Sequence, residues 1–230
     1  MLTIRPGHER GHANHGWLNS YHSFSFASYY DPRYMGVSCL RVINDDTVAP
    51  GAGFSTHGHR DMEIISYVLS GGLEHKDSMG NGSVIRPGEV QRMSAGRGIQ
   101  HSEFNASRNE TVNFLQIWIR PNVSGTEPNY AQKDFSQRLD GKLALVVSPD
   151  GRDDSLSIHQ DVLVYAARLQ KGQHIHHASG HGRKLYLHLA RGVVSLNTQT
   201  LEAGGGATLI DEALELDCDT DAEFLLFDLP

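Results

Sequence analysis

The sequence predicts an all-β protein that contains two copies of one β-barrel. Short apolar segments rich in β-branched and aromatic residues recur along the 230 residues, separated by Gly, Pro and Asn. No long segment shows the 3.6-residue periodicity of an amphipathic helix. The order of strands and turns in the N-terminal half recurs in the C-terminal half, which indicates a duplication.

Two strongly apolar segments predict strands in the N-terminal half. Residues 63–69 (EIISYVL) end at the glycine pair 71–72, and residues 112–119 (VNFLQIWI) end before Pro121. Between them we expect a second strand, a turn at 87–88 and another strand. This half therefore has the strand, turn and strand order of one barrel.

The C-terminal half repeats this order. A strand at 185–189 (LYLHL) is followed by a turn at Gly192, a second strand (VVSLN) and a glycine turn at 204–206. Strands at 207–210 and 224–229 complete the pattern. We expect the two copies to meet within the polar segment 121–142, and so predict domains over 1–125 and 126–230.

The acidic residues near the C-terminus also fit a strand. They alternate with Leu214, Leu216 and Cys218, as expected for a half-exposed strand rather than a calcium loop.

Composition and charge exclude several classes of function. Apolar residues make up 39% and charged residues 20%, as in ordinary globular proteins. No segment is apolar enough for a membrane helix, and the first residues lack the apolar region of a secretory signal. The two cysteines, Cys39 and Cys218, predict no disulfide framework and favour the cytoplasm. The net charge of −7 comes from the C-terminal half, so direct binding to nucleic acid is not expected.

Two same-face pairs of residues predict a metal site. His57 and His59 lie two positions apart, so on a strand both imidazoles project to one face. His101 and Glu103 have the same spacing, and two adjacent antiparallel strands would present three nitrogens and one oxygen to one ion. Such ligands suit Fe, Mn, Co, Ni, Cu or Zn rather than Mg or Ca. The alternative for each histidine is a solvated loop residue, because 14 histidines produce such pairs by chance.

The residues around the first pair match the first motif of the cupin fold. Gly51 precedes His57 by six positions, and Glu63 follows His59 by four. The closing glycine comes one position late, at Gly71.

The second pair lies in the core of the second cupin motif. Gly98 precedes His101 by three positions and Asn105 follows it by four, although Gly96 stands where the motif has proline. Both motifs in order within about fifty residues give a strong joint signal.

Beyond these motifs, the sequence resembles the pirin family, in particular its bacterial members that are quercetin dioxygenases. The resemblance is closest through residue 120 and rests on GHANHGWLNSYHSFSFASYYDP (11–32), RVINDDTV (41–48), THGHRDMEIISYVLSG (56–71), HKDSMGN (75–81) and MSAGRGIQHSEFN (93–105). It implies a bicupin of two jelly-roll-like barrels, with one metal in the N-terminal barrel and a degenerate, empty C-terminal barrel.

The resemblance also implies the ligands. They are His57, His59, His101 and Glu103, which hold one divalent transition metal ion, with iron favoured. Glu63, a ligand in many other cupins, is expected here to support the site instead.

The function implied is that of a quercetin 2,3-dioxygenase. A six-coordinate ion with four protein ligands has two neighbouring coordination positions open. This suits a chelating substrate, or a substrate together with O2. We expect cleavage of a flavonol such as quercetin with release of carbon monoxide, and Glu103 as the base that removes the 3-hydroxyl proton. The alternative is a non-enzymatic, redox-sensing module that regulates a protein partner, and an isomerase or decarboxylase is also open on this scaffold. We expect a monomer with no membrane partner.

The densest group of histidines lies in the C-terminal half, at His174, His176, His177 and His181. A second metal site would need a partner, expected near residues 206–212, and that segment contains no histidine. Adventitious metal binding is therefore favoured over a specific site.

Several N-terminal side chains could also belong to the site. Three histidines could orient the ligands, although ordinary hydrogen-bonded roles are favoured: His12, His15 and His22. Three aromatic residues could either line a flavonoid pocket or pack in the core: Phe24, Phe26 and Phe54.

Overall fold

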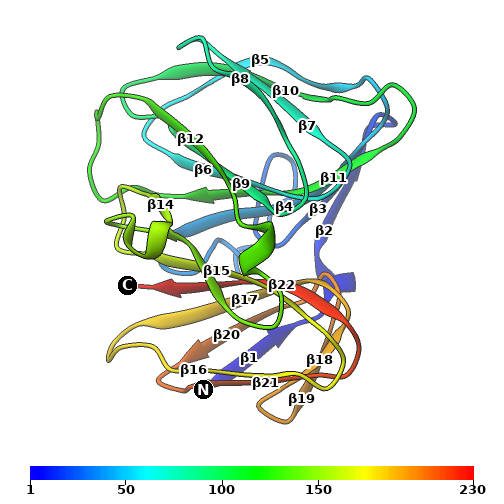
Figure 1. The fold of residues 1–230 in the computed structure, drawn as a ribbon, viewed down its shortest axis with the longest axis vertical. Coiled ribbons are helices and arrows are strands. Elements are labelled where there is room, and N and C mark those ends of the chain that lie inside the picture. The colour runs from blue at the N-terminus through cyan, green and yellow to red at the C-terminus, as the bar shows by residue number, and fades with distance from the viewer. The chain divides into compact units, whose positions relative to one another are not determined.

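The structure, a computed structural model, describes residues 1–230, and almost all of its regular structure is strand (Figure 1). The first eleven strands are β1 (Leu2–Arg5), β2 (Gly11–Asn14), β3 (Leu18–His22), β4 (Leu40–Val48), β5 (Gly53–His59), β6 (Glu63–Ser70), β7 (Leu73–Asp77), β8 (Gly82–Ile85), β9 (Glu89–Ser94), β10 (Ile99–Asn105) and β11 (Val112–Ile119). The others are β12 (Asn129–Asp134), β13 (Ala144–Ser148), β14 (Leu156–Ser157), β15 (Leu163–Leu169), β16 (His174–His177), β17 (Lys184–Arg191), β18 (Val193–Leu196), β19 (Gln199–Glu202), β20 (Gly206–Ile210), β21 (Leu214–Cys218) and β22 (Ala222–Leu229). Three 3-10 turns complete the regular structure, at η1 (Gly7–Glu9), η2 (Ser136–Arg138) and η3 (Arg152–Asp154). None of these helical turns has the length or apolar character needed to span a membrane.

The chain divides into two compact units, each made of separate stretches of sequence. The N-terminal unit contains Gly11–Ser136 and Ile158–Gln160, and the C-terminal unit contains Met1–Arg10, Gln137–Ser157 and Asp161–Pro230. These limits differ from the expected domains 1–125 and 126–230, which stay a prediction. The difference arises because the first and last edge strands of the sheets are taken from distant parts of the chain.

The two units have the same architecture, which confirms the duplication expected from the sequence. In the N-terminal unit a seven-stranded sheet has the order β12-β9-β6-β11-β4-β3-β2, and a four-stranded sheet has the order β5-β10-β7-β8. In the C-terminal unit the corresponding orders are β1-β20-β17-β22-β15-β13-β14 and β16-β21-β18-β19. Thus β5 and β10 of the first unit correspond to β16 and β21 of the second. All the strands expected from apolar segments are present.

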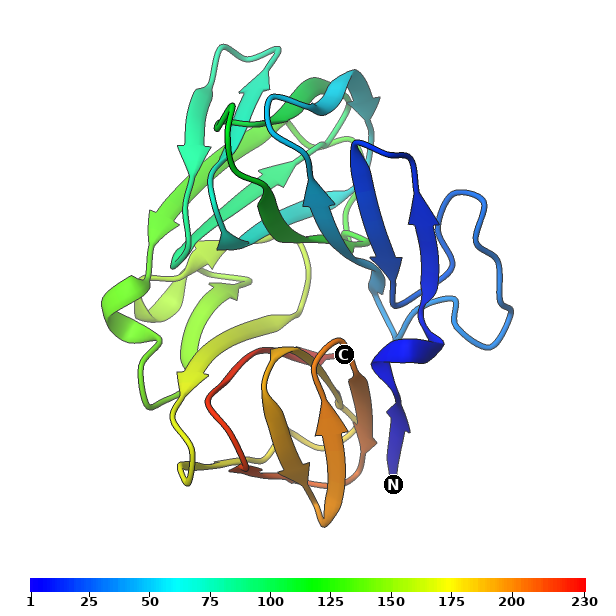
Figure 2. The same ribbon diagram turned by 90° about the vertical axis from the view of Figure 1, so that its right-hand side faces the viewer.

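The large sheet of each unit ends in an equivalent edge strand, but the two edge strands come from different parts of the sequence. In the N-terminal unit β12 pairs with β9, and in the C-terminal unit the corresponding place beside β20 is taken by β1. Figure 2 shows β1, the blue strand at the N label, whose residues run from Leu2 opposite Leu209 to Arg5 opposite Gly206. The strand β12 lies inside the segment 121–142, where the sequence predicted only an interruption.

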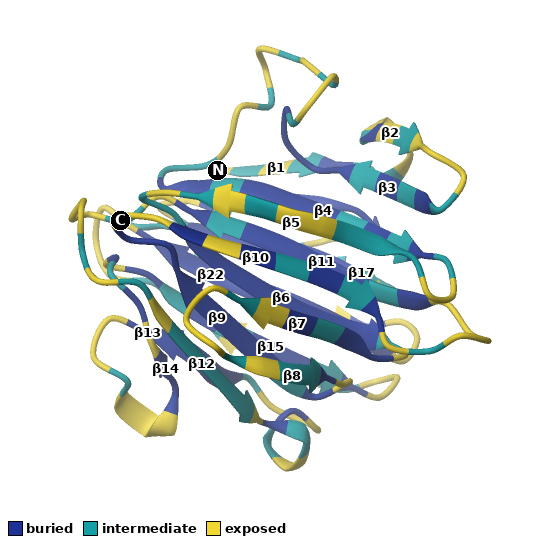
Figure 3. Cartoon of the chain, turned by 90° about the horizontal axis from the view of Figure 1, so that it is seen from above, coloured by how far each residue is buried: buried dark blue, intermediate teal, exposed yellow.

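The core of the N-terminal unit is formed by strands that are buried along their length. In Figure 3, β6 and β11 are mostly dark blue, because seven of the eight residues of β6 are buried. Burial of both faces explains why EIISYVL is mostly apolar and does not alternate between apolar and polar residues. By contrast, all residues of β5 are at least partly accessible, and the expected ligands His57 and His59 lie on this strand.

Candidate metal centre and its cavity

The two predicted ligand pairs lie on neighbouring strands. β5 and β10 are antiparallel, and His101 lies directly opposite His57 while Ile99 lies opposite His59. The register shifts between His101 and Glu103, which marks a β-bulge. A bulge changes the direction in which the following side chain projects. The side-by-side arrangement expected from the sequence is therefore present, with a bulge that the sequence did not show.

Three imidazoles converge at the centre of this strand pair. The ring centroids are 4.5 Å apart for His57 and His101, and 4.8 Å apart for His59 and each of the other two. One ligand nitrogen from each ring lies within 4.8 Å of the others, so the three could hold one metal ion. Trp118 packs edge-on against His59, with ring centroids 5.0 Å apart, and limits the movement of that imidazole.

The protonation of these rings suits metal binding. Burial and the neighbouring His57 lower the pKa of His59 to about 4, and the same two causes lower the pKa of His101 to about 2. Both rings are therefore neutral near pH 7, the form in which an imidazole binds a metal. The His57 Nδ1 donates to the Ser55 carbonyl oxygen at 2.8 Å, which leaves its Nε2 lone pair available. His101 Nε2 is buried without a hydrogen-bond partner, and a metal ion would satisfy it.

Glu103 is a buried carboxyl group held by two neighbours. Ser66 Oγ donates to its Oε1 at 3.1 Å, and Gln116 Nε2 donates to its Oε2 at 2.6 Å. Burial raises the pKa of Glu103 to about 7, although both hydrogen bonds act in the opposite direction. A bound cation would favour the ionised form. Glu103 belongs to a second group of possible ligands, together with His101 and His75.

His75 is a site residue that sequence reasoning missed. It is buried on β7, its Nε2 lies 3.2 Å from Asp77 Oδ2, and its Nδ1 lies 3.5 Å from His101 Nδ1. The ring stacks on Tyr130 with centroids 4.8 Å apart. The spacing of His75 and Asp77 on one strand is the same two-residue spacing that marked the other pairs. That signal was present in the segment HKDSMGN (75–81).

The carboxylate of Glu63 contacts residues other than the expected ligands, in keeping with the supporting role expected for it. Its side chain is buried on β6, where Ser94 Oγ donates to Oε2 at 2.7 Å. His159 Nδ1 lies 3.1 Å from the other oxygen, Oε1. Both carboxylate oxygens thus have partners within the N-terminal unit.

A cavity of about 700 Å³ opens beside three of the expected ligands, His57, His59 and Glu103. Its apolar lining includes the aromatic residues Trp17, Phe26, Phe54 and Trp118. Of the three aromatics considered from the sequence, Phe26 and Phe54 therefore line the cavity, whereas Phe24 is buried in the core.

One wall of the cavity is polar. Ser20 and His22 on β3, and Asn44 and Asp46 on β4, all line it. His22 Nδ1 lies 2.8 Å from Asn44 Oδ1, and Ser20 Oγ donates to Asp46. Burial raises the pKa of Asp46 to about 7. The sequence reasoning missed this wall except for His22, although Asn44 and Asp46 show the same-face spacing.

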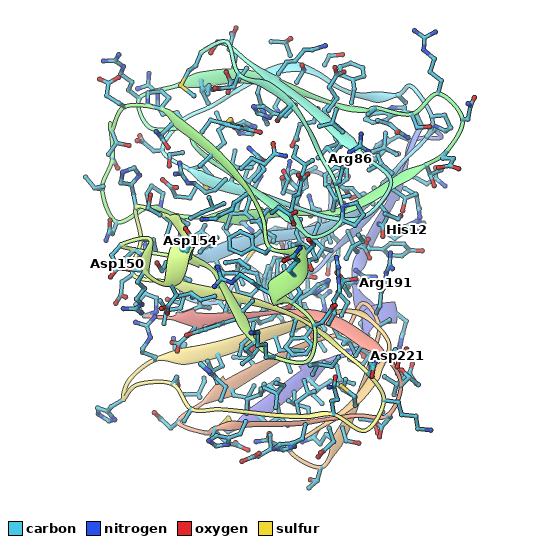
Figure 4. All side chains as sticks on the ribbon, viewed as in Figure 1. His12, Arg86, Asp150, Asp154, Arg191 and Asp221 are labelled. Atoms are coloured by element: carbon cyan, nitrogen blue, oxygen red, sulfur yellow. The ribbon has the colours of Figure 1, made fainter.

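Two other histidines from the N-terminal segment lie at or near this cavity. His15 lines it, and His12, labelled in Figure 4, stacks on Tyr21 and lies 2.6 Å from Asn19 Oδ1 through its Nε2. Neither is in a group of possible metal ligands with His57, His59 and His101.

The C-terminal histidines have a different environment. The strand beside β16 is β21, not the segment 206–212 considered from the sequence. His174 and His176 are 49% and 56% exposed, and they pair with Asp217 at 2.9 Å and Glu215 at 2.7 Å. A cavity of about 510 Å³ in this unit is lined by charged residues such as Arg191 and Asp221 (Figure 4) and contains no histidine.

Comparison with known proteins places the chain in a family. Residues 4–119 match the family model described as pirin, and residues 145–229 match the quercetinase C-terminal cupin domain. A quercetin 2,3-dioxygenase of Escherichia coli is 49% identical over 231 residues, which cover 100% of this chain and 99% of that protein. The chain belongs to the pirin family. A pirin-like protein of Caulobacter vibrioides is 43% identical to this pirin over 231 residues, or 99% of each chain.

A solved structure shares the fold of this pirin over its full length. The bacterial pirin YhhW of Escherichia coli in complex with nickel(II) has a TM-score of 0.95 and 48% identity, covering 100% of this chain and 99% of that one. This pirin is therefore a bicupin, as the motifs and the resemblance predicted.

Proposed function

We propose that this pirin is a metal-dependent dioxygenase that cleaves a flavonol such as quercetin with O2 and releases carbon monoxide. The observation that supports this most is the cavity, in which aromatic side chains lie beside His57, His59 and Glu103. Its volume of about 700 Å³ is within the range of small-molecule sites. The name of the Escherichia coli relative, quercetin 2,3-dioxygenase, supports the choice of substrate.

The proposed cofactor is one divalent transition metal ion, held by His57, His59, His101 and Glu103. Neutral imidazoles and the unpartnered His101 Nε2 support this assignment. The Escherichia coli pirin is described in complex with nickel(II), which supports a divalent ion as the cofactor of this chain. Iron is the metal we favour, although the same ligands also suit Mn, Ni, Co, Cu and Zn. Bound there, the ion would supply Lewis acidity and open positions for substrate and O2.

The side chains around the ion would bind the flavonol and take up its proton. Trp17, Phe54 and Trp118 offer flat apolar surfaces for the aromatic rings of the substrate. Glu103 would accept the 3-hydroxyl proton, because its carboxylate faces the cavity between Ser66 and Gln116. These two neighbours would hold the carboxyl group in position as the proton moves.

The test is oxygen uptake and trapped carbon monoxide with quercetin, measured after loading with iron, manganese, nickel, cobalt, copper and zinc in turn. We expect stoichiometric O2 consumption and carbon monoxide with at least one metal. His176→Ala is the matched control, because it removes an exposed histidine of the other unit. If no metal supports turnover above that of Glu103→Gln, the dioxygenase proposal fails. A redox-sensing module for a protein partner would then be the better hypothesis.

Two further expectations belong to this proposal: a monomeric state and a cytoplasmic location. Cys39 and Cys218 are both free and buried, which supports a reducing compartment.

A further inference from the structure

A line of three buried side chains runs from β7 to the candidate metal centre. Asp77 Oδ2 lies 3.2 Å from His75 Nε2, and His75 Nδ1 lies 3.5 Å from His101 Nδ1. The side chains of His75 and Asp77 are both wholly inaccessible. The line ends at His101 Nε2, which is buried and has no partner among the protein atoms.

The carboxylate at the start of the line has a fixed orientation. Asp77 Oδ1 accepts hydrogen bonds from the backbone N–H groups of Met79 at 2.9 Å and Asn81 at 3.0 Å. Asp77 Oδ2 accepts from Asn81 Nδ2 at 2.9 Å, in addition to its contact with His75. Because an ionised carboxylate can only accept, the nitrogen of His75 that faces it must carry a proton.

That proton determines the tautomers of both rings. Both rings are buried, which disfavours the charged form of each. A neutral His75 with its proton on Nε2 has a bare Nδ1, which accepts from His101 Nδ1. A neutral His101 with its proton on Nδ1 has a bare Nε2 lone pair. Each ring nitrogen in the line then has a hydrogen-bond partner, except His101 Nε2, which would bind the metal ion.

We propose that Asp77 and His75 form a positioning relay that fixes the tautomer of His101, so that Nε2 presents its lone pair to the metal. This inference rests on the metal site of the proposed function. The stacked ring of Tyr130 would keep His75 in the plane that the relay requires. The competing assignment makes His75 itself a ligand with His101 and Glu103. That assignment would leave His101 Nε2 buried and unused, at the energetic cost of an unsatisfied polar atom.

The sharpest test is Asp77→Asn in metal-free protein labelled with 15N in its histidines. The new side-chain oxygen must keep the hydrogen bonds to the two backbone N–H groups, so the amide NH2 faces His75 and Asn81. The side-chain amide of Asn81 then turns so that its oxygen accepts from this NH2 group. An amide NH2 donates, so His75 would move its proton to Nδ1 and His101 would move its proton to Nε2. Nitrogen NMR should show His101 Nε2 as pyridine-type in the wild type and pyrrole-type in the variant. An unchanged tautomer in Asp77→Asn, or a pyrrole-type Nε2 in the wild type, overturns the relay.

The metal gives a second readout. Asp77→Asn should bind nickel(II) about 10- to 100-fold more weakly in competition with a chelator. His75→Leu should do the same, whereas His75→Asn should bind close to wild type, because its side-chain oxygen can still accept from His101. Equal losses in the two His75 variants would show a merely structural role and overturn the relay. Tyr130→Phe is the control, since it keeps the stacked ring and leaves the line of nitrogens intact.

Pulsed EPR of the copper(II)-loaded protein separates the relay from the competing assignment. The relay predicts the same number of coordinated imidazoles in His75→Asn as in the wild type. Loss of one imidazole would identify His75 as a ligand and overturn the relay. If no variant and no wild-type protein binds metal, the proposed function fails, but the tautomers of the metal-free protein still decide whether the relay exists.

Discussion

At the scale of single residues, the role of each carboxylate follows from what its oxygens already contact. Glu63 and Glu103 are both buried, and each has a hydrogen-bond partner on both oxygens. Glu63 is bonded to Ser94 and His159, whereas Glu103 also lines the cavity beside the imidazoles. The first is therefore suited to holding strands in place, and the second to binding metal and substrate.

The first prediction separates these two carboxylates. His101→Ala should weaken binding of a divalent metal by more than about 100-fold, because it removes the most buried of the three imidazoles. Glu63→Gln should keep about one metal per chain after dialysis, because its oxygens are engaged elsewhere. Elemental analysis of both proteins gives the metal content. Full retention in His101→Ala would contradict the ligand assignment.

The second prediction concerns the proton. In Glu103→Gln the amide oxygen can still coordinate a metal but cannot accept a proton. Turnover of quercetin should therefore fall by about 10²- to 10⁴-fold, a typical loss for a general base, while metal affinity falls much less. Rates at saturating quercetin, compared with metal content in the same samples, give the two effects. Parallel losses would mean that Glu103 acts only as a ligand.

The third prediction is a pH dependence set by Asp46. Burial raises its pKa from 3.8 in the unfolded chain to about 7 in the folded protein. Between these values the folded state keeps a proton that the unfolded chain has lost. The free energy of unfolding therefore decreases as the pH rises from about 4 to about 7. Asp46→Asn cannot ionise, so from pH 5 to pH 8 it should gain about 2 kcal/mol relative to the wild type.

Denaturant unfolding of the metal-free proteins at several pH values measures this difference. Glu103 titrates in both proteins, so its contribution cancels in the comparison. Curves of stability against pH that stay parallel for the two proteins would show that Asp46 is not protonated in the folded state.

Only part of the site could be predicted from the sequence. His57, His59, His101 and Glu103 stood out because motif spacing places both pairs on strand faces. The polar wall with Asp46 could not be predicted, because its contacts join β3 and β4. Which strands are neighbours in a sheet is a tertiary property. The spacing of His75 and Asp77 marked them as a same-face pair, but the contact of His75 with His101, 26 residues away on another strand, could not be predicted.

At the scale of strands, the difference between the two units is which face of a strand its histidines occupy. On β16 and β21, Ile175, Leu214 and Leu216 belong to the apolar core of the C-terminal unit, so His174 and His176 face outward. On the corresponding β5 and β10, the expected ligands His57, His59 and Glu103 line the cavity. Side chains alternate along a strand, so the two pairs differ in the face of the strand on which they lie.

The fourth prediction follows from this outward orientation. Replacing His174, His176 and His177 together by alanine should leave about one metal per chain after extensive dialysis, because the two half-exposed rings are paired with acidic side chains rather than gathered around a cavity. The variant should also keep the wild-type melting temperature within a few degrees, as expected for surface substitutions. Metal analysis and thermal unfolding measure both. A fall to half of the wild-type metal content would reveal a second specific site.

Strands with apolar segments were predictable, and polar edge strands were not. Most residues of β6 and β11 are buried, so their sequences are mostly apolar. β12 has the polar sequence NYAQKD and contains no buried residue, because only its backbone is needed to extend the sheet beside β9. Such a strand leaves little trace in hydrophobic periodicity.

At the scale of the whole chain, each unit completes its large sheet with a strand from outside its own half of the duplication. β1 takes beside β20 the place that β12 takes beside β9. Leu2 and Ile4 pack against the apolar core of the C-terminal unit, whereas Thr3 is exposed. The sequence could not show this pairing, since a strand of four residues has no preferred partner by itself.

The fifth prediction tests the contribution of β1. Ile4→Ala should lower the free energy of unfolding of the C-terminal unit by about 1–2 kcal/mol, less than for a fully buried isoleucine. Thr3→Ala on the same strand is the matched control and should change it by less than about 0.5 kcal/mol. Hydrogen exchange should speed up at β20 in Ile4→Ala, while β6 and β11 stay protected. Equal effects of both substitutions would mean that β1 does not pack as described.

The place of β1 also has a consequence for synthesis. Leu2 of β1 lies opposite Leu209 of β20, so β1 leaves the ribosome long before its partner strand. During synthesis the N-terminal unit can fold as soon as its own strands are complete, but β1 stays unpaired until β20 has been made. β1 has only four residues and is followed directly by Pro6, so it has few backbone groups that could pair with a wrong strand before β20 is made. A bulky group fused next to β1 would therefore slow the pairing of β1 with β20, the step that completes the large sheet of the C-terminal unit.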